Sequence, residues 1–444
     1  MELLSVSVGG FRNLAYTTIE LGGITALVSP NNYGKSNLLD AIRFAFQFIE
    51  SGNKRRNNLM RSTNCIPLSP SLSNDDFRFS IEFDDPSLGE YRFVRYGFSF
   101  SWPKDDGSGC KITGETLEIN AKRSGTWTNY LRRNRGQYKK GHDTRSFRSI
   151  SLDDSQLAID VLTAVEDIEI NPAIRSIFDI TYAICDSLET ENRFHSTPLE
   201  FGETMDDSTA MFNDVDLPRA LYRLKQSDPE HYDIFQSAIY TLFPEFEHIS
   251  VNSYELRPED HERLSQALKK DDIPEENIPF HIRDDLYRLM VKSANLNQPV
   301  DISHMSTGTK RIIWLVANTI IAGANSAGCI GIEEIETSIH PRMMRELLEV
   351  LNENIGSTSL LLTSHSPFLI QYLKPEKIYL GVPSKDGVAT FKRVKKSKTK
   401  DVLDSAYNRG LGFGEYLFEL MSSDDDGLRA LGTLLEDRYE RLLI

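Results

Sequence analysis

Residues 29–36, Ser-Pro-Asn-Asn-Tyr-Gly-Lys-Ser, have the types and spacing needed to hold phosphate groups. They follow the apolar run 24–29, which predicts a strand, and lead into residues 36–49, which predict a helix. A tight loop between such elements aims successive backbone N–H groups inward, and the helix N-terminus adds positive potential. We therefore expect Lys35 to reach the β- and γ-phosphates of a nucleotide and the Ser36 hydroxyl to bind Mg²⁺.

This segment resembles the P-loop pattern G-x-x-x-x-G-K-[ST] except at its first position, where Ser29 replaces glycine. That glycine serves the turn more than the phosphate, so the replacement is compatible with binding but predicts altered affinity. The alternative is a chance Gly-Lys-Ser loop without a ligand. The residues predicted to bind the nucleotide here are Asn31, Asn32, Gly34, Lys35, Ser36 and Asn37.

Two adjacent carboxylates, Glu333 and Glu334, end the apolar run 329–332. Burying two charges at a strand end is costly, and a bound Mg²⁺ together with a water to be deprotonated would compensate for it. Glu333 stands at the Walker B position, where most families carry aspartate, and is expected to hold the Mg²⁺ shell. Glu334 is expected to act in catalysis by orienting or deprotonating the attacking water. The alternative is a strand that ends in a solvated acidic loop.

Residues 305–310, Met-Ser-Thr-Gly-Thr-Lys, open a predicted helix and resemble the L-S-x-G-x signature of ABC-type ATPases. The Ser306 hydroxyl, the Gly308 N–H and the helix dipole together suit a γ-phosphate. In that family the signature cannot reach the nucleotide of its own P-loop, so the resemblance implies that it serves a second protomer. An ordinary N-cap at Ser306 is the alternative.

Two further segments follow in the order that the family has. Residues 336–341, Glu-Thr-Ser-Ile-His-Pro, resemble the D-loop of the dimer interface, and residues 363–367, Thr-Ser-His-Ser-Pro, resemble the switch-histidine loop. The resemblance implies that His365 touches the γ-phosphate and reports its loss. A lone histidine at a strand end is usually structural, and the preceding motifs favour the functional interpretation.

Two more nucleotide contacts are predicted from position in the chain. The Q-loop glutamine, a metal ligand in this family, should follow the antiparallel strands and begin the insert, which favours Gln156 over Gln137. Arg12, in the turn 10–14, matches an F-R-N motif of RecF-like and OLD-like proteins, in which the arginine approaches the nucleotide phosphates. The alternative for Arg12 is an ordinary surface arginine.

The elements that must position these residues are of two kinds. Residues 77–83, 91–100 and 112–120 alternate as strands do and predict an antiparallel layer, whereas helices and strands alternate after residue 300 and predict a mostly parallel sheet. Helix-like segments lie between, among them 283–294, without the heptads of coiled-coil arms. The predicted fold class is α/β, an ABC-ATPase head with a mixed sheet and an antiparallel β layer, plus an inserted helical domain.

The predicted domains are three. Residues 1–156 form an ATPase lobe with the P-loop and the antiparallel strands, and residues 157–299 form the inserted helical domain. Residues 300–444 form an ATPase lobe with the signature, Walker B, D-loop, switch histidine and tail.

Composition places the chain among globular proteins of two or three units: it has 444 residues, 40% hydrophobic and 26% charged. The four cysteines show no C-x-x-C spacing, so reduced thiols are expected rather than a zinc site or disulfides. No apolar run is long enough to cross a bilayer and the start reads as a strand and turn, which predicts a cytoplasmic protein without a membrane partner.

The net charge of −15 argues against a protein that coats duplex nucleic acid, so any nucleic-acid contact must be local. Two basic segments could provide it, and solvated loops or partner-docking surfaces are the alternatives. Their cations are Arg132, Arg133, Arg135, Lys139, Lys140, Arg145 and Arg148 in the first, and Lys392, Arg393, Lys395, Lys396, Lys398 and Lys400 in the second.

Together the motifs resemble the RecF/SMC/OLD branch of ABC-type ATPases over roughly residues 1–50 and 300–375, and they look most like the OLD-type subgroup. This resemblance implies ATP and Mg²⁺ as ligands, ATP hydrolysis, and a head-to-tail dimer or higher homo-oligomer. OLD nucleases continue into a Toprim domain. Residues 376–444 contain Asp424, Asp425 and Asp426 but no strand-borne glutamate motif, so we expect no metal nuclease in this chain.

An ATPase of this size without a Toprim domain is similar to the ATPase subunits of two-component antiphage systems such as PARIS and Septu. That resemblance implies an ATP-gated sensor and scaffold whose partner is a separate effector, a nuclease or a toxin. The alternative is a RecF-like ATPase of DNA repair that binds duplex DNA. The negative charge and the large insert favour the scaffold over the repair protein.

Overall fold

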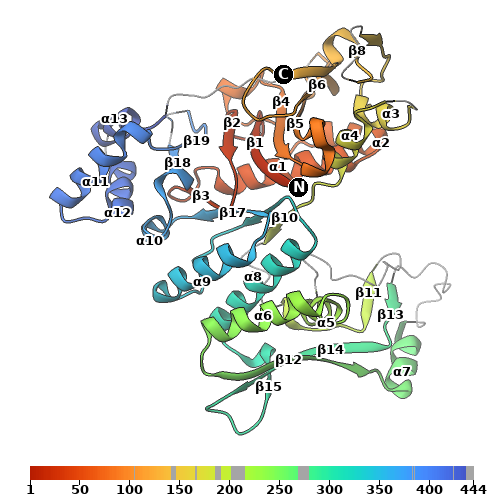
Figure 1. Ribbon diagram of the computed structural model, residues 1–444, viewed down its shortest axis with the longest axis vertical. Helices are drawn as coiled ribbons and strands as arrows, with labels where there is room; N and C mark the ends of the chain where they lie inside the picture. The colour runs from red at the N-terminus through yellow and green to blue at the C-terminus, as the bar shows by residue number, and fades with distance from the viewer. Residues whose placement is uncertain are drawn as a thin grey trace. The chain divides into compact units, whose positions relative to one another are not determined.

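The computed structural model describes residues 1–104, 106–141, 147–165, 168–185, 192–201, 216–268, 280–382, 384, 386–423 and 425–436. The chain divides into two compact units (Figure 1). The first unit comprises Met1–Ile184, Ser326–Ile335 and Ser357–Ile444, and the second comprises Cys185–Asn325 and Glu336–Gly356. The boundaries predicted at residues 157 and 300 do not coincide with this division, because the chain passes back and forth between the units.

The first unit contains the predicted antiparallel layer as an eight-stranded sheet. Phe77 and Phe79 point to the face that carries helix α1 (Lys35–Glu50), while the alternate residues Ser80 and Glu82 point to the opposite, polar face. In spatial order the strands are β2 (Thr17–Glu20), β1 (Glu2–Gly9), β4 (Phe77–Asp84), β5 (Phe93–Ser101), β6 (Lys111–Asn120), β7 (Thr128–Arg132), β8 (Gln137–Tyr138) and β9 (Arg148–Ser149).

A six-stranded sheet completes the first unit and is mixed, as predicted. Its central strands pair in parallel, and its last pair is antiparallel. The central strands β3 and β17 are buried along their whole length, as is typical of parallel strands covered on both faces. In spatial order the strands are β10 (Tyr182–Cys185), β16 (Cys329–Ile332), β17 (Ser359–Ser364), β3 (Ile24–Val28), β18 (Ile378–Val382) and β19 (Thr390–Lys392).

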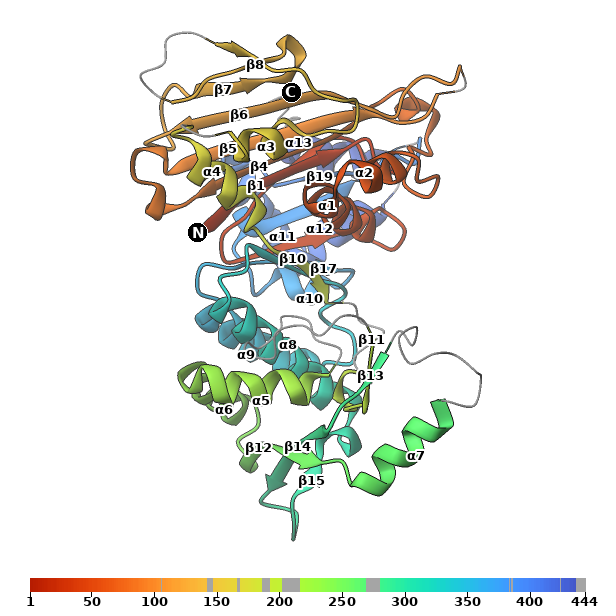
Figure 2. The same ribbon diagram turned by 90° about the vertical axis from the view of Figure 1, so that its right-hand side faces the viewer.

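The core of the first unit forms around α1, which lies beside the antiparallel strands in Figure 2. The helix predicted over residues 36–49 is present, and it buries the apolar residues Leu38, Leu39, Ile42, Phe46 and Ile49. Phe48 stacks on Phe98 and Phe100 with ring centroids 4.9 and 5.1 Å apart. The same cluster takes in Leu27 of β3 and Leu361 of β17, so one core fixes α1 against both sheets.

Smaller helices complete this unit. Two of them, α3 and α4, were predicted to belong to the insert and instead belong here. The helices are α2 (Asn53–Met60), α3 (Ala158–Thr163), α4 (Asn171–Phe178), α10 (Pro367–Ile370), α11 (Thr399–Asn408), α12 (Phe413–Ser422) and α13 (Asp425–Leu434).

Over its described residues, the second unit combines helices with two small sheets, so the insert is not purely helical. Its helices are α5 (Leu217–Ser227), α6 (Pro229–Leu242), α7 (Pro258–Leu268), α8 (Thr307–Ala324) and α9 (Pro341–Asn354). Its strands are β12 (Phe246–Glu255), β14 (Asp285–Ser293) and β15 (Val300–Asp301) in one sheet, and β11 (Leu199–Phe201) and β13 (Phe280–Ile282) in the other.

The prediction of a helix at residues 283–294 was wrong. Strand β14 occupies this segment and pairs with β12 in antiparallel register, with Leu289 opposite Val251 and Val291 opposite Ile249. Both members of each pair are buried. A short apolar run fits the helical and the strand period equally well, and here the alternating burial of the paired strands decides.

Among the described residues, no helix has the length and apolar character needed to span a bilayer. All four cysteines are free thiols in the structure.

Candidate nucleotide site

The loop after β3 has the backbone of a phosphate cradle. Asn32 and Gly34 adopt left-handed φ angles of 65° and 87°. A Cβ atom at position 34 would lie 2.6 Å from the Ala389 Cβ, so only glycine fits this close approach. Gly34 is the N-cap of α1, no side chain caps the helix, and its first turn contains no acidic residue. The end of α1 is therefore suited to an anion.

Lys35 folds back over this loop. Its ammonium group donates hydrogen bonds to the backbone oxygens of Ser29 at 2.8 Å and Pro30 at 3.1 Å, and the residue is buried. The cation is therefore held at the loop whose N–H groups are expected to receive phosphate. The contact of Lys35 with the phosphates stays a prediction. Asn31 and Asn32 are exposed on the same loop.

Ser29, the departure from the P-loop pattern, is accommodated by a neighbouring strand. Its side chain is fully buried against Gly381 of β18, where a Cβ atom would lie only 2.6 Å from the Ser29 Cβ. The side chain that is added at position 29 is thus matched by one that is missing at position 381.

The acidic pair lies at the same edge of the sheet as this loop. Because β16, β17 and β3 run parallel in register, their carboxyl ends meet at one edge. The Ser29 N–H donates to the Ser364 oxygen at 3.3 Å, and the Glu334 N–H donates to the Thr363 hydroxyl at 3.0 Å. The loop, Glu333, Glu334 and the segment 363–365 therefore converge.

Glu334 and His365 face each other across two strand ends. The Glu334 Oε1 and His365 Nδ1 atoms are 4.0 Å apart, and each side chain is 43% exposed. Glu334 also adopts a left-handed φ of 43°, which is uncommon outside glycine and is typical of strained functional positions. The pair can thus meet a reactant at the surface of the unit.

Tyr182 supports the strand beneath the acidic pair. Its hydroxyl donates to the Leu39 oxygen at 3.3 Å, and a Cβ atom at Gly331 would lie 2.7 Å from that hydroxyl. Burial raises the pKa of Tyr182 well above its usual value, so the phenol stays neutral beside Glu333. Sequence reasoning did not find this residue, because a single tyrosine in a short strand carries no motif.

The F-R-N turn is docked on α1. The Arg12 Nη1 atom donates to Asn37 Oδ1 and Asp40 Oδ2, both at 2.8 Å, and Asn37 Nδ2 donates to Asn13 Oδ1 at 2.7 Å. Arg12 is therefore anchored to the first turns of α1, and its approach to the nucleotide phosphates stays a prediction. Asn13 and Asp40 were missed from the sequence, although the i, i+3 spacing of residues 37 and 40 places both on one helix face.

Gln156 lies in a loop that is held by hydrogen bonds from Arg133, next to the antiparallel strand β7. Its backbone oxygen accepts a hydrogen bond from Arg133, which also donates to the Asp153 oxygen at 2.8 Å. The buried Glu115 of β6 accepts the N–H groups of Ala158 and Ile159, at 2.7 and 3.2 Å, and so caps α3. The Q-loop role of Gln156 stays a prediction.

Burial raises the pKa of Glu115 to about 7, although these N–H groups and Arg133 favour its charged form.

The signature segment and the D-loop segment lie together in the second unit. Ser306 caps α8, its Oγ accepting the Thr309 N–H at 3.2 Å, so the capping role that was the alternative interpretation is present. A Cβ atom at Gly308 would lie 2.5 Å from the Ser338 oxygen, and Ser338 itself adopts a left-handed φ of 63°. His340 caps α9. Service to a second protomer stays a prediction.

The oxygen donors at the edge of the six-stranded sheet fit Mg²⁺. Ser36 offers a hydroxyl on the first turn of α1, and Glu333 offers a carboxylate at the end of β16. Hard oxygen ligands of this kind are the ones that Mg²⁺ prefers, with phosphate oxygens and waters as the remainder. In the part of the chain that is described, no cluster of three histidine, cysteine or acidic residues could hold a metal without such help. Asp424 lies outside the described residues.

The two basic segments differ in their pairing. In the second, Arg393 is bound to Glu20 and Glu436 at 2.9 and 3.1 Å, and Lys398 to Asp401 at 2.8 Å. In the first, Arg133 lies 3.6 Å from Glu115, while Arg132 and Lys139 lie over the Phe147 ring. Arg145 lies outside the described residues.

Known proteins resemble this chain in sequence and in fold. Residues 5–270 match a family model described as an AAA domain, and residues 198–371 match one described as "AAA domain, putative AbiEii toxin, Type IV TA system". A stretch of 111 residues is 32% identical to the chromosome partition protein Smc of Clostridium kluyveri (strain NBRC 12016). That stretch covers 22% of this chain and only 9% of the Smc protein.

Two solved structures of SMC heads extend the comparison. The SMC head bound to the C-winged helix domain of ScpA superposes with a TM-score of 0.50 at 15% identity, covering 90% of this chain and 100% of that one. The SMC head with an extended coiled coil bound to the C-terminal domain of ScpA derived from Pyrococcus furiosus gives 0.48 at 14% identity, covering 91% and 99%.

The first of these superpositions shows that the chain has the fold of an SMC head. The AAA match over residues 5–270 takes in more than half of the 444 residues and includes the loop that ends in Lys35. This chain therefore belongs to the AAA domain family.

Proposed function

We propose that this chain hydrolyses ATP with Mg²⁺ at a site shared between two copies arranged head to tail. The observation that carries this proposal is the convergence of three groups at one sheet edge: the Lys35 loop, the Glu333–Glu334 pair and His365. The 4.0 Å between Glu334 and His365 brings a carboxylate and an imidazole beside the loop that is suited to phosphate.

Each residue then has a defined task. The N–H groups of the loop and the Lys35 ammonium bind the phosphates, and Ser36 and Glu333 supply oxygen ligands to the metal. Mg²⁺, when bound there, neutralises charge on the phosphate oxygens. Glu334 orients the attacking water and accepts its proton, and His365 contacts the γ-phosphate.

The exposed start of α8 supports the shared site. Ser306 and Thr307 are exposed at the N-terminus of an 18-residue helix, and Gly308 lies against the D-loop segment. This helix end belongs to a different unit from Lys35. We propose that it receives the γ-phosphate of nucleotide bound to a second copy.

The reaction is tested with Glu334→Gln. Loss of the general base should lower the ATPase rate by about a hundredfold or more while ATP binding persists. Glu353→Gln, which alters an exposed carboxylate on α9, is the matched control and should leave the rate unchanged. A Glu334→Gln protein with the parent rate would refute the assignment.

We further propose that the ATPase controls a separate effector in antiphage defence. The family match to a putative toxin of a type IV toxin–antitoxin system supports this role. The test is co-purification of the products of neighbouring genes with the Glu334→Gln protein in ATP and in ADP. An effector should be retained in ATP, and a neighbourhood of replication genes without such a partner would contradict the proposal.

A RecF-like role in DNA binding is the second candidate, favoured by Arg132, Arg135 and Lys139 near one end of the antiparallel sheet. Within the described ranges none of the three forms an ion pair with a carboxylate. Reversing the charge of Arg135 and Lys139 should weaken retention of duplex DNA and flatten its salt dependence. No retention by the parent protein at low salt would exclude this role.

A further inference from the structure

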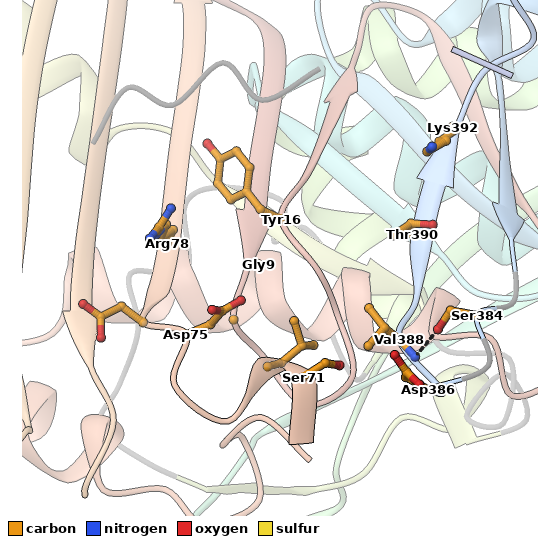
Figure 3. Close-up of a pocket in the computed structure, with 13 residues that line it drawn as sticks. Gly9, Tyr16, Ser71, Asp75, Arg78, Ser384, Asp386, Val388, Thr390 and Lys392 are labelled. Carbon is orange, nitrogen blue, oxygen red and sulfur yellow. Dashed lines mark hydrogen bonds between the residues drawn. The ribbon is translucent and has the colours of Figure 1, made fainter. Parts of the chain in front are cut away.

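A cleft in the first unit shares no residue with the nucleotide loop, residues 29–36. It has a volume of about 450 Å³ and lies between the polar face of β1, β2, β4 and β5 and the strands β18 and β19. A further cleft of about 620 Å³ adjoins it, and the two share Tyr16, Thr390 and Lys392. Figure 3 shows these three residues in the second of these clefts, with Arg78 of β4 on the side opposite β19.

The floor of the smaller cleft is a row of hydroxyl groups. Ser7 and Thr18 are hydrogen-bonded to each other at 2.8 Å, and the Tyr16 and Ser80 hydroxyls are 3.3 Å apart. Ser7 and Ser80 are buried, and both line the cleft. Small polar residues on a covered face leave room for a polar ligand in place of packed side chains.

Every carboxylate of this cleft is already neutralised. Glu82 accepts hydrogen bonds from Arg95 and Arg123, both at 2.7 Å. Glu20 and Glu436 both bind Arg393. Three arginines thus match three carboxylates, and the arginine heads are fixed in place by these pairs.

Two lysines of the cleft are left over. Lys392 and Lys396 line it, and in the described portions of the chain neither forms an ion pair. The lining of the cleft contains five cations and three carboxylates, so its formal charge is +2. The chain as a whole has a net charge of −15. An anion bound here would contact two ammonium groups and a hydroxyl-lined floor.

The adjoining cleft limits the size of that anion. It is lined by Asp75, Asp76 and Asp386 with only Arg78 and Lys392 as cations. These carboxylates would repel a continuous phosphate backbone that ran through both clefts. The volume of the basic part lies in the range of small-molecule sites.

We propose that the cleft between β1 and β19 binds a small phosphorylated molecule, a nucleotide or an inorganic polyphosphate, at a site separate from the Lys35 loop. Lys392 and Lys396 contact its phosphate, and the hydroxyl row contacts its polar remainder. The site is independent of the ATPase activity proposed above.

The test is calorimetric binding of inorganic pyrophosphate and of adenosine 5′-monophosphate to the full chain carrying Lys35→Ala, which removes the main cation of the nucleotide loop. Lys392→Glu in that background should weaken binding by roughly tenfold to a hundredfold, the loss expected for a charge-assisted contact. Lys400→Glu, an exposed lysine of the same segment outside the cleft, is the matched control and should change it little. Tighter binding of the monophosphate than of pyrophosphate would identify a nucleotide as the ligand.

Two results would overturn the proposal. One is the absence of binding by either probe at concentrations up to about 10 mM. The other is equal weakening by Lys392→Glu and Lys400→Glu, which would indicate long-range attraction without a site. Hydrogen exchange on the chain without substitutions guards against a folding defect, because pyrophosphate should protect the amides of residues 390–392.

Discussion

Gly381 and Ser29 are complementary: a Cβ atom at position 381 would lie 2.6 Å from the Cβ atom of Ser29. Strand β18 has a glycine, without a side chain, at the point where Ser29 adds a side chain to the nucleotide loop. The loop can therefore depart from the glycine of the P-loop pattern without being displaced.

Gly381→Ala should lower the affinity for ATP, because the added methyl group must push Ser29 and the start of the loop. Overpacking of this kind costs about 1–3 kcal/mol. Ser29→Gly in the same chain removes the opposing Cβ and should restore part of the affinity. Titration of a fluorescent ATP analogue measures both variants, and a double variant no better than Gly381→Ala would contradict the relationship.

Arg12→Ala and Asp40→Ala separate two roles of the Arg12 ion pair. If Arg12 contacts the phosphates, its removal should weaken ATP binding by roughly tenfold to a hundredfold. Asp40→Ala should then have a smaller effect, because Asn37 still holds the guanidinium. The affinity of both variants for ATP is measured by equilibrium binding. Equal losses of affinity would show that Arg12 acts through its ion pair with Asp40 and not by contacting the phosphates.

Mixing two inactive variants tests the head-to-tail arrangement. Ser306→Arg should block closure while the loop still binds nucleotide, and Lys35→Ala should abolish nucleotide binding itself. A mixed dimer contains one composite site with an intact loop and an intact signature, so part of the ATPase activity should return. The measurement is ATPase rate against mixing ratio, with subunit exchange verified separately. A rate that stays at zero throughout would favour sites complete within each chain.

Glu115→Gln should change the pH dependence of stability. Because the folded pKa of Glu115, about 7, exceeds its ordinary value of 4.5, the folded chain binds this proton more tightly than the unfolded chain. Its contribution to the free energy of unfolding is therefore full below pH 4.5 and is lost as the pH rises to about 7, by about 2–4 kcal/mol. The glutamine variant should lose this slope in urea denaturation between those values. If the slope of stability against pH is unchanged in the variant, a group other than Glu115 titrates in this range.

The nucleotide loop and the sheet edge could be predicted from the sequence because their chemistry is local. A glycine, a lysine and a serine between a strand and a helix specify a phosphate cradle, and strand ends collect at one edge of a parallel sheet. Glu334 and His365 are 31 residues apart and still meet, because β16 and β17 are neighbours in the sheet.

Other features depend on contacts that no local pattern records. The strand β14 was mistaken for a helix because its pairing with β12 decides its conformation. The match between Ser29 and Gly381 joins residues far apart in the chain, and each alone is an unremarked small residue. The placement of α3, α4 and α8 likewise depends on which core each helix joins, and the helical period does not specify it.

The chain enters the first unit at Ser326 and leaves it again after Ile335. Glu334 is therefore the second-last residue of this stretch of the first unit. The next residue, Ile335, donates a backbone hydrogen bond to the Thr363 oxygen at 3.3 Å. Along the chain, the residue Ile335 is the link between Glu334 and the D-loop segment, which begins at Glu336. Only one residue, Ile335, therefore separates the predicted catalytic carboxylate from the start of the D-loop segment.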